Sequence, residues 1–184
     1  MTSEHKQAVQ LHPELVAQLK KTRESKRKFN VEDWIDKKTD MLNDYMRKCK
    51  LKAVVVNVSG GIDSAVTIAL ARAAKQKKDS PIERVVGVAQ PIKSTAAIWQ
   101  RALLLASEHV EVITVDQSEI HSSLQKVCDE AIQITGNEFV AGQLKSYMRT
   151  PVGFYIAQLL SQKGTPAIVL GTGNMDEDGY LFYF

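Results

Sequence analysis

A run of β-branched residues that ends at two adjacent glycines is the feature that most constrains the fold of this chain. Residues 54–66 read VVVNVSGGIDSAV, with Gly60 and Gly61 in the middle. The apolar run is typical of a buried strand, and the residues after Gly61 are typical of the start of a helix. The sequence therefore predicts a strand, a tight turn and a helix N-terminus in direct succession.

The predicted turn is suited to binding an anion. A helix N-terminus leaves backbone N–H groups unpaired at the positive end of the helix dipole. Gly60 and Gly61 carry no Cβ, so an anion can approach the backbone closely. Ser59 and Ser64 add hydroxyl donors, and Asp63 would repel a bare phosphate but accept one that carries Mg²⁺. These residues predict a pocket for a magnesium-bound polyphosphate.

Helical and strand patterns alternate along the chain, which is typical of an α/β protein with a doubly wound parallel sheet and helices on both faces. Asn30 is the expected N-cap of the first helix, and Pro151 predicts a kink or a restart in the last one. Ligands of such sheets bind beyond the carboxyl ends of the strands, so the loops after the first and fourth strands should share one edge. The expected helices cover residues 31–48, 62–77, 95–109, 119–134 and 140–162, and the expected strands cover residues 53–58, 84–89, 110–115 and 167–170.

Length and composition favour one domain, residues 31–184, preceded by a basic arm, residues 1–30. The chain has 184 residues and a net charge of +3, which is too small to indicate a nucleic-acid partner. No stretch approaches the roughly 20 apolar residues of a membrane span. The beginning of the sequence has no apolar segment of a signal peptide. Cys49 and Cys128 are isolated, which fits a reducing cytoplasm.

The arm has two possible roles. Residues 20–28 contain six basic residues and one acidic residue, Glu24. Such a run is a solvated face or a docking arm for an anion or a partner, and the sequence leaves both open.

Three motifs carry a resemblance to a known family. Residues 59–64 (SGGIDS) lack both the Walker pattern and G-x-G-x-x-G, and they resemble the pyrophosphate loop of the N-type ATP pyrophosphatases, the PP-loop superfamily. Residues 171–177 (GTGNMDE) are similar to the G-T-[GS]-N-x-x-E loop of NAD synthetases. Residues 142–149 (GQLKSYMR) resemble the G-N-x-x-A-R-x-R helix start of the same family. The resemblance covers about residues 31–184.

The resemblance implies an ATP-dependent ligase of NAD biosynthesis. Members of the family adenylate deamido-NAD and release pyrophosphate, and ammonia then displaces AMP from the NAD-adenylate to give NAD. The sequence shows no nucleophile with a paired base, which fits a reaction run by positioning and charge neutralisation. ATP and Mg²⁺ are the implied cofactors, a homodimer is the implied assembly, and free ammonia is the nitrogen donor unless a separate glutaminase supplies it.

The resemblance also assigns roles to residues. It implies that Asp63 and Glu177 bind Mg²⁺, with a solvated acidic turn as the alternative for Glu177. Lys145 and Arg149 lie at i, i+4 on one helix face, so both can point at one polyanion or simply be exposed charges. We expect Lys145 and Arg149, with Asp63, to be the catalytic residues. The expected ATP-binding residues are Ser59, Gly60, Gly61, Ile62, Asp63, Ser64, Gln90 near the adenine, and Thr172.

Two departures from the family keep other readings open. Tyr147 stands where the motif has an arginine that meets deamido-NAD, and a phenol cannot neutralise a phosphate. The sequence ends on an apolar stretch, residues 180–184, so we expect the protein to be C-terminally incomplete. The alternatives are another PP-loop enzyme, a GMP synthetase-like amidating or a thiolating one, or a nucleotide-binding module without catalysis.

Two helices offer apolar faces for the implied homodimer. The helix before the first strand carries Trp34, Met41 and Tyr45, and the last helix carries Phe154 and Tyr155. The same side chains could instead pack only on the sheet.

Overall fold

The computed structural model describes residues 12–106 and 109–174, and the chain divides into two compact units, Met1–Lys37 and Lys38–Phe184. The first unit contains helix α1 (Pro13–Arg27) and the start of helix α2 (Val31–Lys48). Asp33 N donates to Asn30 Oδ1 at 3.1 Å, which confirms the predicted N-cap of α2. Helix α1 was not predicted, because its apolar side chains are few and stay exposed.

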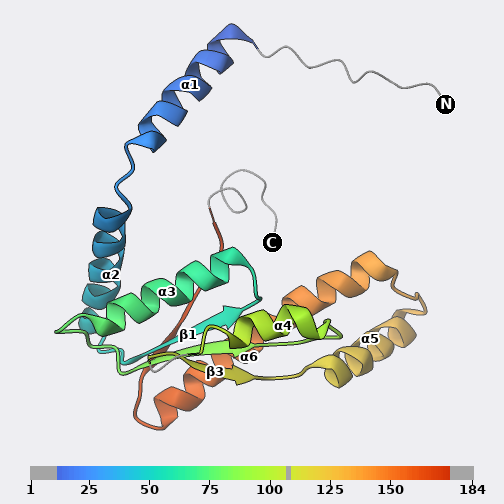
Figure 1. Ribbon diagram of the computed structural model, residues 1–184. Helices are drawn as coiled ribbons and strands as arrows, with labels where there is room; N and C mark the ends of the chain where they lie inside the picture. Colours follow the sequence, from blue (N-terminus) through green and yellow to red (C-terminus); the bar gives the residue numbers. More distant parts are fainter. Residues whose placement is uncertain (1–11, 107–108, 175–184) are drawn as a thin grey trace. The chain divides into compact units, whose positions relative to one another are not determined.

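The second unit is built on a four-stranded parallel sheet with the order β3-β2-β1-β4 (Figure 1). Its strands are β1 (Ala53–Val58), β2 (Arg84–Ala89), β3 (Glu111–Thr114) and β4 (Ala167–Leu170). β1 lies in the interior of the sheet, where Val55 pairs with Val86 of β2 and Val169 of β4. All pairings are parallel, as the alternation of helices and strands predicted.

Helices cover both faces of this sheet (Figure 1). Helices α3 (Ile62–Gln76) and α4 (Ala96–Leu103) pack on one face, around a core that includes Val54 and Val56 of β1. Helix α6 (Glu138–Gln162) packs on the other face, around Val55, and helix α5 (Ser118–Ile132) contacts α6. Because successive side chains of a strand point to opposite faces, β1 supplies both cores, and the doubly wound α/β class is confirmed.

Several element boundaries differ from the sequence prediction. Helix α4 ends at Leu103, six residues before the predicted end at 109. Helix α6 begins two residues early, because Asn137 Oδ1 caps it by accepting from Val140 N at 3.0 Å. The helix runs without interruption through Pro151, so of the two outcomes expected there, a kink or a restart, the restart is wrong. Packing of the residues around Pro151 on the sheet outweighs the one hydrogen bond that proline removes.

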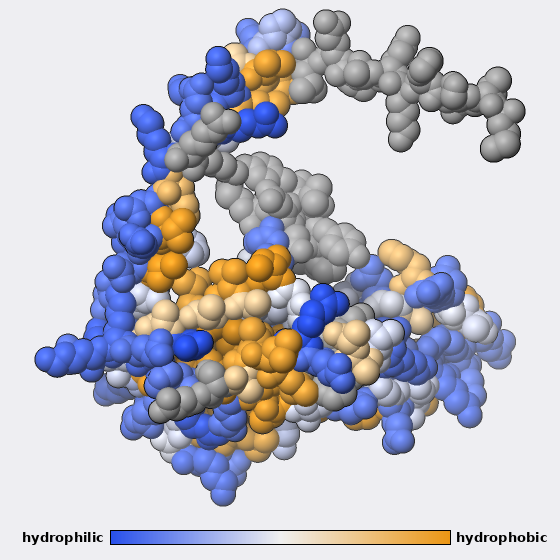
Figure 2. Space-filling view, viewed as in Figure 1, coloured by the Kyte–Doolittle hydropathy of each residue, from blue (hydrophilic) through white to orange (hydrophobic). Residues whose placement is uncertain are grey.

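The face that carries α3 and α4 also has exposed apolar side chains. Figure 2 shows them gathered over these two helices. Ile62 at the start of α3 and Leu104 at the end of α4 are 73% and 81% exposed. Ile62, the first residue of α3, is therefore not part of the core.

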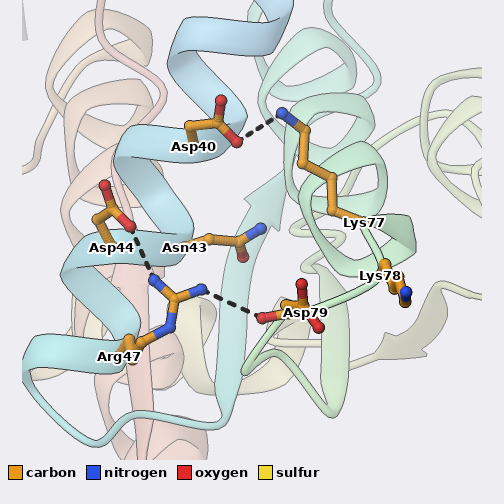
Figure 3. A pocket seen from close by; sticks show the side chains of 7 residues that line it. All are labelled: Asp40, Asn43, Asp44, Arg47, Lys77, Lys78 and Asp79. Atoms are coloured by element: carbon orange, nitrogen blue, oxygen red, sulfur yellow. Dashed lines mark hydrogen bonds and ion pairs between the residues drawn. The ribbon is translucent and has the colours of Figure 1, made fainter.

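A polar pocket of about 540 Å³ lies at the amino edge of the sheet, between α2 and the end of α3 (Figure 3). Four of its charged side chains form two ion pairs, and in one of them Lys77 Nζ lies 2.6 Å from Asp40 Oδ1. Arg47 binds Asp44 and the carbonyl of Asp79. Such pairing ties α2 to α3, and it indicates a structural contact between the two helices.

A buried amide, Asn43, reinforces the same contact. Its side chain is 4% exposed. Its Nδ2 donates to the carbonyl of Ala74 at 3.0 Å, and its Oδ1 accepts from Ser80 Oγ at 3.0 Å. Both ends of this amide are therefore satisfied far from the carboxyl edge of the sheet.

Two glycines of α6 should respond to alanine in opposite directions. A Cβ on Gly153 would lie 2.8 Å from Asn57 Oδ1, whereas one on Gly142 would meet nothing within 4 Å. We expect Gly142→Ala to raise the free energy of unfolding by about 0.5–1 kcal/mol, the helix-propensity gain. Gly153→Ala should lower it by about 1–2 kcal/mol, because overpacking exceeds that gain. Urea denaturation measures both, and equal effects would contradict the close approach of α6 to β1.

Candidate functional site

The order of the strands marks one end of the sheet as the place for a ligand. From β1 the chain moves outward to β2 and β3, and then returns to place β4 on the other side of β1. Crevices form at the carboxyl ends of strands where the strand order reverses in this way. Here that point lies between the ends of β1 and β4. The loops that follow these strands are the two glycine-rich loops singled out by sequence.

The two loops meet across this crevice. Asn174, in the loop after β4, donates from Nδ2 to Asp63 Oδ1 at 3.1 Å, a contact between residues 111 positions apart. Asp63 lies in the first turn of α3 and is partly buried. Thr172 is partly buried in the same loop as Asn174. The expectation that both loops share one edge is therefore confirmed by direct contact.

The loop between β1 and α3 is held in shape by its own hydrogen bonds. Ser64 Oγ accepts from Ser59 N at 3.2 Å and donates to the carbonyl of Gly61 at 3.1 Å. Gly61 N in turn donates to Ser59 Oγ at 3.2 Å. Gly60 has a φ of 80°, in the region that favours glycine. The turn is thus held in shape by bonds within the protein itself.

The start of α3 keeps its backbone donors available. Its N-cap, Gly61, makes no side-chain capping hydrogen bond, so the first N–H groups of α3 are not covered by a side chain. Ser59 is exposed beside them, whereas Ser64 is 2% exposed and directs its hydroxyl to Gly61. In this geometry Ser64 supports the loop, whereas Ser59 and the helix N-terminus are accessible, an arrangement suited to binding an anion.

A cation from the opposite face reaches the same end of the sheet. Arg149 of α6 lines a small cavity of about 30 Å³ together with Ser59, Gln90, Pro91 and residues near them. Burial lowers the pKa of the Arg149 guanidinium, which still stays protonated at neutral pH because its ordinary value is so high. Arg149 therefore places a partly desolvated positive charge near the loop.

The other predicted site residues lie at different distances from this cavity. Lys145 lies one turn earlier on α6 and is partly buried, but it does not line the cavity with Arg149. Glu177 lies outside the described residues. Within residues 12–106 and 109–174, no group of three or more acidic, histidine or cysteine side chains could hold a metal ion. Asp63 is therefore a single carboxylate in the described part of the site.

The side chain of Gln90 is engaged by the protein itself. It is 6% exposed, donates from Nε2 to Asn57 Oδ1 at 2.8 Å and accepts on Oε1 from Gln117 Nε2 at 2.7 Å. Sequence reasoning missed Asn57 and Gln117. The polar Asn57 inside an otherwise apolar strand was the available signal for one of them, and nothing local marks the other.

Solved structures share this fold. The chain matches the NAD⁺ synthetase of Burkholderia pseudomallei with a TM-score of 0.66 and 23% identity, covering 79% of this chain and 54% of that one. It matches the NMN synthetase of Francisella tularensis with a TM-score of 0.70 and 22% identity, covering 85% and 59%. At this level of identity the likeness establishes the fold.

The fold and the two loops define a doubly wound α/β protein with two glycine-rich loops in contact at the carboxyl edge of its sheet. The chain belongs to the NAD synthase family, because the family model described as NAD synthase matches residues 34–184. The NH₃-dependent NAD⁺ synthetase of Alkaliphilus oremlandii is 30% identical over 162 residues, 84% of this chain and 60% of that protein. The corresponding protein of Methanosarcina mazei is 31% identical over 141 residues, 75% of this chain and 50% of that protein. The chain thus spans between half and three fifths of these relatives.

Removing the Ser64 hydroxyl should destabilise the loop. We expect Ser64→Ala to lower the free energy of unfolding by about 1–2 kcal/mol, because the Ser59 N–H and the Gly61 carbonyl lose a part-buried hydrogen-bond partner. Ser122→Ala is the matched control, since Ser122 Oγ also bonds within a helix, to the carbonyl of Ser118, but is exposed. The control should change stability by less than about 0.5 kcal/mol. Thermal denaturation compares the two, and equal effects would contradict the supporting role of Ser64.

Proposed function

We propose that this chain is the ATP-binding part of an NAD synthetase, an ATP-dependent ligase of NAD biosynthesis. In the proposed reaction the carboxylate of deamido-NAD attacks the α-phosphorus of ATP and pyrophosphate leaves. Ammonia then attacks the acyl carbon of the NAD-adenylate, and AMP leaves. The observation that carries the proposal is the contact between Asp63 and Asn174, which joins the two family loops at the ligand edge of the sheet.

The residues of the loop would hold the phosphates of ATP. Backbone N–H groups at the start of α3, including that of Ile62, would donate to the departing pyrophosphate, and Ser59 would add a hydroxyl. Arg149 supplies a positive charge in a partly desolvated setting, where such charges are most effective. We assign Lys145 the same task and Thr172 a contact with ATP. Gly60 and Gly61 permit the close approach.

Asp63 suits a magnesium ion. A carboxylate is a hard oxygen ligand, and Mg²⁺ is usually held by one or two carboxylates together with substrate phosphates. One oxygen of Asp63 accepts from Asn174, which orients the carboxylate. When bound, Mg²⁺ would neutralise phosphate charge. Glu177 is proposed as the second carboxylate.

The substrate that receives the amide nitrogen is proposed to be deamido-NAD, because the relatives are named NAD⁺ synthetases. Tyr147 is 62% exposed on α6 and brings no charge to the place where the family motif has an arginine. The fold by itself does not select the acceptor, since the NMN synthetase of Francisella tularensis shares it. Measurement of the amidated product therefore has to accompany measurement of pyrophosphate.

Further proposals concern the setting of the enzyme. Free ammonia is proposed as the nitrogen donor, with a separate glutaminase as its possible source, and the cytoplasm as the location. Residues 1–30 are proposed as an arm and residues 31–184 as the ATP pyrophosphatase domain. Among the helices described, none has the length and apolar character needed to cross a membrane.

Replacing Asp63 tests the function. Asp63→Asn should lower the rate of NAD formation from ATP, Mg²⁺, ammonium and deamido-NAD by about 100-fold, the usual effect of losing one charge-stabilising group. Asp44→Asn is the control, because Asp44 is an exposed carboxylate at the opposite edge. NAD and pyrophosphate are measured together. Absence of both products with the full-length protein would overturn the proposed function, and an unchanged rate for Asp63→Asn would overturn the metal assignment.

A homodimer is proposed through α6 and α2. Phe154 and Tyr155 of α6 are 55% and 63% exposed, and Met41 and Tyr45 of α2 are 59% and 50% exposed. Apolar side chains in such number on helix surfaces are typical of an interface.

Charge on this surface should separate the subunits. We expect Phe154→Arg to shift the sedimentation coefficient from that of a dimer to that of a monomer, because the interface would bury an unpaired charge. Leu104→Arg is the control, since Leu104 is 81% exposed but lies after α4. A monomeric unaltered chain would contradict the homodimer, and a dimer that persists in Phe154→Arg would contradict this interface.

A further inference from the structure

Three amide side chains, two of them buried and the third, Asn57, partly buried, form a hydrogen-bonded chain beneath the candidate site. Gln117 Nε2 donates to Gln90 Oε1 at 2.7 Å, and Gln90 Nε2 donates to Asn57 Oδ1 at 2.8 Å. Asn57 Nδ2 then donates to the main-chain carbonyl of Arg149 at 3.5 Å, a long contact. Gln117 is 3% exposed and Gln90 is 6% exposed. We refer to Gln117, Gln90 and Asn57 as the amide chain.

The amide chain has a direction. Gln90 accepts on its oxygen from Gln117 and donates from its nitrogen to Asn57, so its amide cannot be rotated by half a turn without opposing donor to donor. Buried hydrogen bonds of this kind polarise one another, and an unpaired buried group costs about 1–3 kcal/mol. The orientation of Asn57 is thereby set by Gln90, and that of Gln90 by Gln117.

The amide chain connects the sheet with α6 at the turn that carries Arg149. Asn57 points to the same face of β1 as Val55, whose core includes residues of α6. Gly153 allows α6 to approach, since a Cβ there would lie 2.8 Å from Asn57 Oδ1. Gln90 and Arg149 line the same cavity beside Ser59. The distance between the Arg149 guanidinium and the loop thus depends on where Asn57 holds α6.

We propose that Asn57, Gln90 and Gln117 are positioning residues that set the register of α6 and so place Arg149 against the phosphates of ATP. The inference rests on the proposed nucleotide site. An apolar trio would fill the same space but would leave α6 able to slide or turn on the sheet, since dispersion contacts have little directionality. Directed hydrogen bonds fix one register, and small displacements of a charged group weaken its action steeply.

Asn43 provides the control for an ordinary buried amide. It is 4% exposed and makes two side-chain hydrogen bonds, like Gln90, but lies at the amino edge of the sheet. Loss of either amide should lower stability to a similar degree. Only loss of the amide chain should alter the position of Arg149.

The test measures binding of ATP with Mg²⁺ to the full chain by calorimetry, alongside thermal denaturation. Gln90→Met keeps the length of the side chain and removes both hydrogen bonds. We expect it to weaken ATP binding about tenfold, whereas Asn43→Leu changes binding less than twofold at a similar loss of melting temperature. In an Arg149→Met background, Gln90→Met should cause no further loss of affinity, because the group that it positions is gone. Should Gln90→Met not fold, Gln117→Met breaks only the first link and should weaken binding about threefold.

Three results would overturn parts of this inference separately. Equal binding by Gln90→Met and Asn43→Leu would overturn the positioning role. The same loss with and without Arg149 would show that the amide chain acts elsewhere and would also overturn it. Absence of ATP binding by the unaltered chain would overturn the proposed nucleotide site itself, and the inference with it.

Discussion

The complete burial of β1 is the constraint on which the rest of the second unit depends. Val54, Val55 and Val56 have no exposed surface, and β1 pairs with a strand on each side. A strand buried on both faces supplies two cores at once, so α3 and α6 are placed relative to it and to each other. Because β1 ends abruptly at the 59–61 turn, the start of α3 and the loop after β4 converge at one end of the sheet.

The positions of the site residues depend on this core and on one polar residue within it. Asn57 interrupts the apolar run of β1, and its partner Gln90 extends from the neighbouring strand toward the same face. Together with Gln117 they form a hydrogen-bonded connection from the sheet to the turn of α6 that bears Arg149. The 59–64 turn needs no such help, since Ser64 closes it locally. One side of the pocket is thus formed by local bonds, and the other by contacts between distant segments.

Much of the fold was predictable, and the failures have identifiable causes. The β-branched run and the glycine turn predicted β1 and α3, since both signals are local. Helix α1 was missed because its exposed surface leaves little periodic apolar signal. The expected restart at Pro151 was wrong, because packing of α6 on the sheet outweighs the cost of one proline.

The sequence by itself determined the parallel α/β class, the glycine turn after β1 and membership of the NAD synthase family, because each rests on residues adjacent along the chain. Only the tertiary structure decided which groups meet at the edge of the sheet. Asp63 and Asn174 are 111 positions apart, and Asn57 and Arg149 are 92 apart. The sequence pattern does not predict such contacts. They form when packing around β1 brings helices from both faces and the two loops to the same end of the sheet.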